Sequence, residues 1–191
     1  DDPIDDLKFH QEIAEKGFYT KVFPTFRPDN LLMAKKPSYP VYIQKLAALV
    51  NFSIHNLEDL LNAIQERINF FDSLGCRLSD YGLEEIYVND FTEKEANEIF
   101  QKRISGNEIT KNEANVFASC ILVKLCEMYH AKNWTQQMHV GAIRNNNSRL
   151  LEKVGLDAGV DSIGDFPVAK AMSKLFNSLN SNNKLAKTIT Y

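Results

Sequence analysis

Four short segments with strand composition recur along this chain at nearly constant intervals, with helical segments between them. They begin near Phe18, Cys76, Trp134 and Lys187, so the steps between them are 58, 58 and 53 residues. Strands that alternate with helices predict βαβ units, and therefore a parallel sheet with right-handed crossovers. Because a minimal unit needs only about 30 residues, we expect additional helices within each crossover.

The helical segments are marked by capping residues and by apolar periodicity. Thr92-x-x-Glu95 and Thr110-x-x-Glu113 are capping boxes, and each predicts the start of a helix. The remaining helices are expected from Asp6 to Lys16, over Tyr39–Val50, from Leu57 to Gly75, from about Ser148 and from Pro167. The first strand is predicted over Phe18–Phe23, where Pro24 stops it.

Four such units do not close a barrel. Eight units of about 56 residues would need about 450 residues, the size of a large (β/α)8 barrel. We therefore interpret residues 1–191 as a single α/β domain that forms part of a decorated, TIM-type (β/α)8 barrel. A four-stranded open sheet is the alternative. The abrupt start at Asp1 and the strand-like end at Lys187–Tyr191 predict that the chain is a piece of a longer protein.

Charge, hydropathy and cysteine usage exclude several classes of partner. The net charge is −3 and no stripe of Lys and Arg with interleaved aromatics occurs, so nucleic acid is a poor candidate. The sequence contains no apolar run of about 18 residues, the length needed to span a bilayer, and no signal-peptide pattern opens the chain. The three cysteines form no CxxC, which indicates reduced thiols and a cytoplasmic location.

Polar residues lie at or just beyond the carboxyl ends of the predicted strands, where α/β folds build their sites. Arg27 follows the first strand, Asp80 the second, and His139 with Arg144 the third. A neutral imidazole can act as a ligand, acid or base. A buried histidine is nevertheless more often a hydrogen-bonded core residue, so both interpretations of His139 stay open.

The arginines and asparagines have similar alternatives. Arg144 could clamp a carboxylate through two hydrogen bonds, or it could be a surface residue. Arg27 lies between two prolines, and this context fits a positioned anion-binding residue and an ordinary surface residue equally well. Asp80 could orient a histidine, bind hydroxyls or end the strand. Asn145, the first of three consecutive asparagines, could bind hydroxyls, and one asparagine is expected to cap the next helix.

One segment resembles a known family. Residues 134–147, WTQQMHVGAIRNNN, are similar to the signature segment of bacterial uronate (glucuronate) isomerases. The similarity continues through DDPID at residues 1–5, KVFPTFRPD at 21–29, GCRLSD at 75–80, GVDSIGD at 159–165 and KTITY at 187–191. It covers essentially the whole chain in order.

The resemblance implies a decorated (β/α)8 barrel of the amidohydrolase superfamily. It implies an aldose–ketose isomerase that interconverts D-glucuronate with D-fructuronate, and D-galacturonate with D-tagaturonate, by proton transfer between C2 and C1. It also implies a divalent metal, commonly zinc. Non-catalytic binding of small anions and metal-assisted hydrolysis on the same barrel are the alternative functions.

The resemblance places this chain between the end of the third barrel strand and the seventh. The family's metal-binding HxH and Asp lie on the first and eighth strands, so no metal ligand is expected here and the isolated chain is predicted to be inactive. The implied roles are contact with the reacting end for His139, and substrate binding for Arg27, Asp80, Arg144 and Asn145. The expected partners are a hexuronate and the rest of the same polypeptide, with a homo-oligomer left open.

Overall fold

A parallel three-stranded sheet organises the computed structural model, which describes residues 1–156 and 158–191. The strand order is β1-β2-β5, and the strands are Leu78–Leu83, Thr135–Val140 and Lys187–Thr190. Each neighbouring pair runs parallel, with Gly82 opposite His139 in the first pair. The predicted α/β fold with a parallel sheet and helical crossovers is therefore confirmed.

The first predicted strand is wrong. Residues 18–23 form no strand, and the side chains of Phe18 and Tyr19 are 60% and 99% exposed. Since these apolar side chains gain no burial, nothing offsets the entropy lost by fixing an extended segment. The chain instead meets β1 a few residues later through a single parallel bridge, in which the Phe26 N–H donates to Leu78 O at 3.1 Å. The sheet thus has three strands and one bridge, where four strands were expected.

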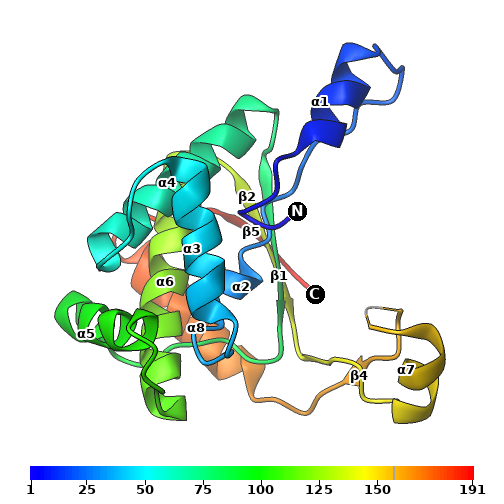
Figure 1. Ribbon diagram of the computed structural model, residues 1–191. Helices are drawn as coiled ribbons and strands as arrows, with labels where there is room; N and C mark the ends of the chain where they lie inside the picture. The colour runs from blue at the N-terminus through cyan, green and yellow to red at the C-terminus, as the bar shows by residue number, and fades with distance from the viewer. Residues whose placement is uncertain (157) are drawn as a thin grey trace.

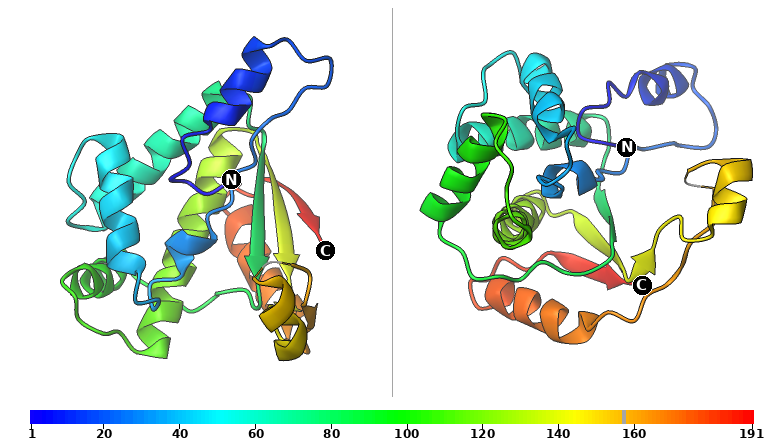
Figure 2. Two further views of the ribbon diagram at one scale, coloured as in Figure 1. Left: turned by 45° about the vertical axis from the view of Figure 1, so that its right-hand side comes forward. Right: turned by 60° about the horizontal axis from the view of Figure 1, so that its bottom comes forward.

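Helices fill the crossovers. Their bounds are α1 Lys8–Glu15, α2 Asp29–Leu32, α3 Tyr39–Val50, α4 Leu57–Ser73, α5 Glu93–Ile104, α6 Lys111–Ala131, α7 Ser148–Val154 and α8 Val168–Asn180. Figure 1 shows α3, α4, α5, α6 and α8 gathered on one side of the sheet, while α1 and α7 project away at opposite ends of the strands. Two further views give the same arrangement (Figure 2).

The predicted caps are formed. Thr110 has both halves of its capping box, and its hydroxyl accepts from the Glu113 N–H at 3.1 Å. At α5 the Thr92 hydroxyl accepts from the Glu95 N–H. The side chain of Asn147 accepts from the Leu150 N–H and caps α7, as expected for one of the three asparagines.

An aromatic cluster lies between the sheet and its helices. Phe26, Phe71, Tyr129 and Trp134 are all fully buried, with the Phe26 ring 5.0 Å from that of Phe71. Tyr129 and Trp134 stack at 5.8 Å. The three cysteines are also buried and unpaired. This packing fixes the position of Phe26, and with it the segment that carries the next residue, Arg27.

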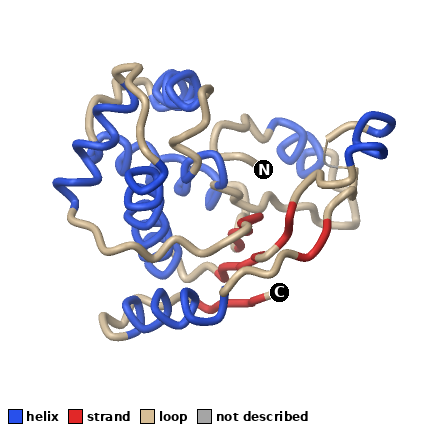
Figure 3. Tube along the Cα trace, turned by 90° about the horizontal axis from the view of Figure 1, so that it is seen from below, coloured by secondary structure: helices blue, strands red, loops and turns tan. Residues whose placement is uncertain are grey.

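The other face of the sheet is not covered by helices. Side chains along a strand alternate between faces, and in β1 the buried residues Ser79 and Tyr81 alternate with the partly exposed Asp80 and Gly82. His139 of β2 lies on the same face as Gly82, its register partner. Figure 3, seen from below, shows most of the helices on one side of the strands, with short helices on the other.

Between β2 and α8 the chain leaves the sheet in a segment that we call the excursion, residues 141–166. It contains α7 and the short antiparallel strands β3, Ala142–Ile143, and β4, Ser162–Ile163. Its ends meet where the Gly164 N–H donates to Gly141 O at 2.7 Å. Across the described residues, no helix combines the length and apolarity needed to cross a membrane.

Candidate functional site

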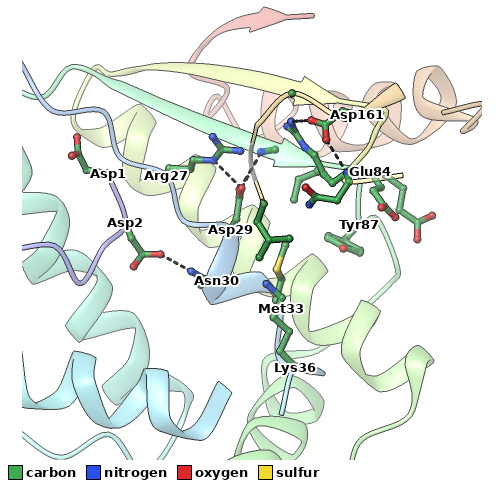
Figure 4. A pocket seen from close by; sticks show the side chains of 17 residues that line it. Asp1, Asp2, Arg27, Asp29, Asn30, Met33, Lys36, Glu84, Tyr87 and Asp161 are labelled. Atoms are coloured by element: carbon green, nitrogen blue, oxygen red, sulfur yellow. Dashed lines mark hydrogen bonds and ion pairs between the residues drawn. The ribbon is translucent and has the colours of Figure 1, made fainter. Parts of the chain in front are cut away.

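A cavity of about 890 Å³ lies at the carboxyl ends of β1 and β2 (Figure 4). Its lining includes Arg27 and Asp29 from the segment before β1, Gly82 from β1, and Arg144, Asn145 and Asp161 from the excursion. Parallel strands end at one edge of a sheet, so the fold brings together residues far apart in sequence. This is the region in which the sequence predicted a site.

Arg27 is held on the cavity wall by two carboxylates. Its Nε donates to Asp29 Oδ2 at 3.0 Å, and its Nη1 lies 3.7 Å from Asp80 Oδ2. Asp29 is fixed in turn, because the Gly82 N–H donates to its carboxylate at 3.1 Å. The Arg27 side chain as a whole remains 44% exposed. It is therefore oriented by protein carboxylates and keeps part of its surface in contact with solvent.

Arg144 enters from the excursion and is oriented by Asp161. Its Nη1 donates to Asp161 Oδ2 at 2.7 Å, while the other oxygen accepts from the Asn145 N–H at 2.8 Å. This backbone hydrogen bond and the Arg144 charge lower the pKa of Asp161. Arg144 Nη2, by contrast, is buried and has no hydrogen-bond partner among the described residues. A charged donor left unpaired is costly, so this nitrogen is a candidate contact for a ligand.

The two guanidinium groups converge. A Cβ built on Gly82 would lie 2.1 Å from Arg27 Nη2 and 3.1 Å from Arg144 Nη2, so both nitrogens approach the same point above β1. Two positive groups that share a small space repel each other. Asp29 Oδ2 lies 3.1 Å from the same point and offsets part of this repulsion, and a ligand carboxylate could accept charge-assisted hydrogen bonds from both arginines.

Beside the arginines, three further side chains form a polar group on the open face of the sheet. The Tyr191 hydroxyl donates to Asp80 Oδ1 at 2.9 Å, and its ring lies 4.8 Å from the His139 ring. Partial burial, the hydrogen bond to Asp80 and the charge of Asp80 raise the pKa of Tyr191. His139 thus faces an aromatic hydroxyl and lies one strand away from Gly82.

The described residues do not gather a metal site of their own. Among them, no three His, Cys, Asp or Glu side chains are placed to hold an ion together. The carboxylates nearest the arginines, Asp29, Asp80 and Asp161, are each engaged by Arg27 or Arg144. The same cavity is also lined by the carboxylates of Asp1, Asp2, Glu84 and Glu85, so the anion-binding groups that converge there are the two arginines.

The structure brings together all five residues that the sequence singled out. Arg27, Arg144 and Asn145 line the cavity, and Asp80 and His139 lie on the adjacent sheet face. One position needs correction, since Asp80 lies inside β1 and not at its end. The strand continues to Leu83 because Tyr81 and Leu83 are buried against the helix layer.

Sequence reasoning missed four residues that position the site: Asp29, Gly82, Asp161 and Tyr191. A glycine inside a strand often marks a close approach of other atoms, so Gly82 carried a usable signal. Asp29 lies two residues from Arg27, within reach of its side chain. Asp161 and Tyr191 carried no such signal, because their contacts are made across long stretches of chain.

A parallel sheet with helical crossovers and a polar cavity at the ends of its strands defines an α/β protein with a candidate binding site at the strand ends. The family model described as glucuronate isomerase matches residues 1–191, and the chain belongs to this family.

Relatives and solved structures agree with that assignment. A uronate isomerase from Bacteroides fragilis is 48% identical over 192 residues, which cover 100% of this chain and 41% of that protein. One from Bacteroides thetaiotaomicron is 47% identical with the same coverage. The crystal structure of uronate isomerase from Thermotoga maritima superposes with a TM-score of 0.89 at 28% identity, covering 100% of this chain and 42% of that one.

A glucuronate isomerase structure from Caulobacter crescentus gives a TM-score of 0.86 at 25% identity, again over 100% of this chain and 40% of that one. The chain therefore matches these enzymes from end to end while spanning about two fifths of their length.

Proposed function

We propose that this chain supplies the central part of the active site of a hexuronate isomerase. The observation that carries the proposal is the convergence of Arg27 and Arg144 above Gly82, in a chain of the glucuronate isomerase family. Hexuronates such as D-glucuronate differ from neutral sugars by one carboxylate. A pair of guanidinium groups at the end of a parallel sheet is suited to bind that group.

In this proposal the two arginines bind and orient the substrate. Arg27 and Arg144 hold the carboxylate, with Asp161 keeping the Arg144 Nη2 directed at it. The sugar hydroxyls then reach the polar group formed by Asp80, His139 and Tyr191, and Asn145 lines the same wall. His139 is the group that we place at the reacting end, where a proton moves between C2 and C1.

We further propose that the sheet is one half of a decorated (β/α)8 barrel. Parallel sheets are almost always covered on both faces, and here the face carrying Asp80 and His139 has no helix layer (Figure 1). Further strands that close the barrel would cover it. The proposal includes a divalent metal, zinc, held by residues outside this chain.

The experiment uses the complete protein that contains this chain. Purified enzyme with added zinc should convert D-glucuronate to D-fructuronate, and D-galacturonate should be tested beside it. D-Glucose, which lacks the carboxylate, and a uronate lactone, which would report hydrolysis, are the controls. Hydrolysis of the lactone without isomerisation of either uronate would overturn the proposal.

The 191-residue chain alone should show no isomerase activity with D-glucuronate and zinc, because the proposal assigns the metal ligands to residues outside it. Assaying both lengths of protein under identical conditions checks this directly. Turnover by the short chain would contradict the claim that the site is incomplete.

A further inference from the structure

Gly82 lies within β1, directly beneath the two guanidinium groups. A Cβ at this position would lie 2.1 Å from Arg27 Nη2, 3.1 Å from Arg144 Nη2 and 3.1 Å from Asp29 Oδ2. The first distance is far inside van der Waals contact, and the others are tight. Any side chain larger than hydrogen would therefore displace the arginine that the cavity needs.

The backbone of Gly82 gives no other reason for glycine. The positive-φ glycines are Gly17, Gly75, Gly106, Gly141, Gly155 and Gly159, and Gly82 is not among them. Glycine inside a strand is destabilising relative to alanine, because it loses more conformational freedom on folding. The chain carries this cost at a position where alanine could adopt the backbone angles. Space for the guanidinium groups is the remaining physical reason.

Gly82 also acts through its backbone. Its N–H donates to both Asp29 oxygens, at 3.1 and 3.2 Å, and Asp29 Oδ2 accepts from Arg27 Nε. The same residue therefore opens the space above the strand and anchors the carboxylate that directs Arg27 into it (Figure 4).

We propose that Gly82 is a positioning residue that sets the preference for a carboxylate-bearing substrate, an inference that rests on the function proposed above. Its missing side chain lets Arg27 and Arg144 present their Nη2 atoms to one anion. The nearest atom to the missing Cβ is the far end of the flexible Arg27 side chain. A methyl group at Gly82 should therefore move the guanidinium without disturbing the fold.

The test is Gly82→Ala in the complete protein, with D-glucuronate as the probe. We expect KM for D-glucuronate to rise about tenfold or more, since charge-assisted hydrogen bonds are lost. The change in kcat should be much smaller, and the thermal midpoint should stay within about 4 °C of wild type. An unchanged KM would overturn the proposal.

A double-mutant cycle separates positioning from a general packing defect. In an Arg27→Ala background the atom that would clash is absent, so adding Gly82→Ala should change KM little further. Fully additive effects would contradict the proposal. Gly106→Ala is the converse control: its φ is +88° and nothing lies within 4 Å of the added Cβ, so it should lower stability and leave KM unchanged.

Failure of the proposed function has a different signature. In that case the wild-type protein would turn over neither uronate, and the crystal structure of Gly82→Ala would still decide the matter. A displaced Arg27 guanidinium supports the positioning role, whereas an undisplaced one refutes it.

Discussion

Arg27 and Arg144 reach the same point above Gly82 from two regions that differ in packing. Arg27 follows Phe26, which is fully buried against Phe71 and Trp134. Arg144 belongs to the excursion, where α7 buries no residue and Ile163 is 95% exposed.

Polar contacts hold the excursion in place. The Arg144–Asp161 pair and the backbone hydrogen bond between Gly164 and Gly141 tie its two ends together. One arginine is thus fixed by the hydrophobic core and the other by a local ion pair. Substitutions should therefore separate stability from substrate binding according to the region in which they fall.

The largest expected effect is on stability, from a substitution in the aromatic cluster that holds Arg27. Phe26→Ala should lower the free energy of unfolding by about 3–5 kcal/mol, because it leaves a cavity in a closely packed aromatic cluster. Ile163→Ala, on the excursion, should change it by less than about 0.5 kcal/mol. Denaturant unfolding of both variants measures the difference. Equal losses would mean that the two regions are packed alike.

The next effect is on binding, from the excursion side. Asp161→Asn removes the charge that orients Arg144 and should raise KM for D-glucuronate about tenfold, the scale of one charge-assisted hydrogen bond. The thermal midpoint should stay near the wild-type value. Asp165→Asn, an exposed neighbour, is the matched control. A large stability loss with unchanged KM would show that Asp161 is a structural residue only.

The smallest expected effect is on the stability of the fold at acidic pH. The hydrogen bonds from Lys102 and from the Thr110 backbone lower the pKa of Glu113 from 4.5 to about 2. A carboxyl whose pKa is lower in the folded state stabilises the fold above its unfolded pKa. That stability is lost as the pH falls from 4.5 through about 2. Glu113→Gln should remove part of this acid slope on the core side, about 1 kcal/mol for a cap.

The pH dependence of substrate binding is the corresponding test for the excursion. Acid that protonates Asp161, whose pKa is lowered by its hydrogen bonds, weakens its ion pair with Arg144, so binding of D-glucuronate should weaken as this carboxyl titrates. Unfolding and binding followed over the same pH range compare the two regions directly. If Glu113→Gln left the acid slope of unfolding unchanged, the capping box would not contribute to it.

Local signals in the sequence predicted most of the fold. Apolar periodicity identified α4, capping residues identified α5 and α6, and strand composition identified β1, β2 and β5. The segment at residues 18–23 failed because strand composition alone does not supply a neighbouring strand or a covered face. Whether such a segment pairs depends on contacts made elsewhere in the chain.

The candidate site, like the fold, was predicted from the sequence only in part. The positions of His139 and Arg144 followed from a strand end that is readable from sequence, whereas Arg27 follows a segment that forms no strand and Asp80 lies inside β1. The contacts that orient these side chains were not readable, since Gly82 meets Asp29 across 53 residues and Arg144 meets Asp161 across 17. Such pairs are defined by the folded geometry and leave no periodic pattern.

The central claim is that two arginines from differently packed regions hold one substrate carboxylate. A crystal structure of the complete protein with D-glucuronate bound tests it most directly. The account predicts carboxylate oxygens about 3 Å from the Nη2 atoms of both Arg27 and Arg144, above Gly82. A carboxylate bound elsewhere, with both arginines paired only to Asp29, Asp80 and Asp161, would contradict it.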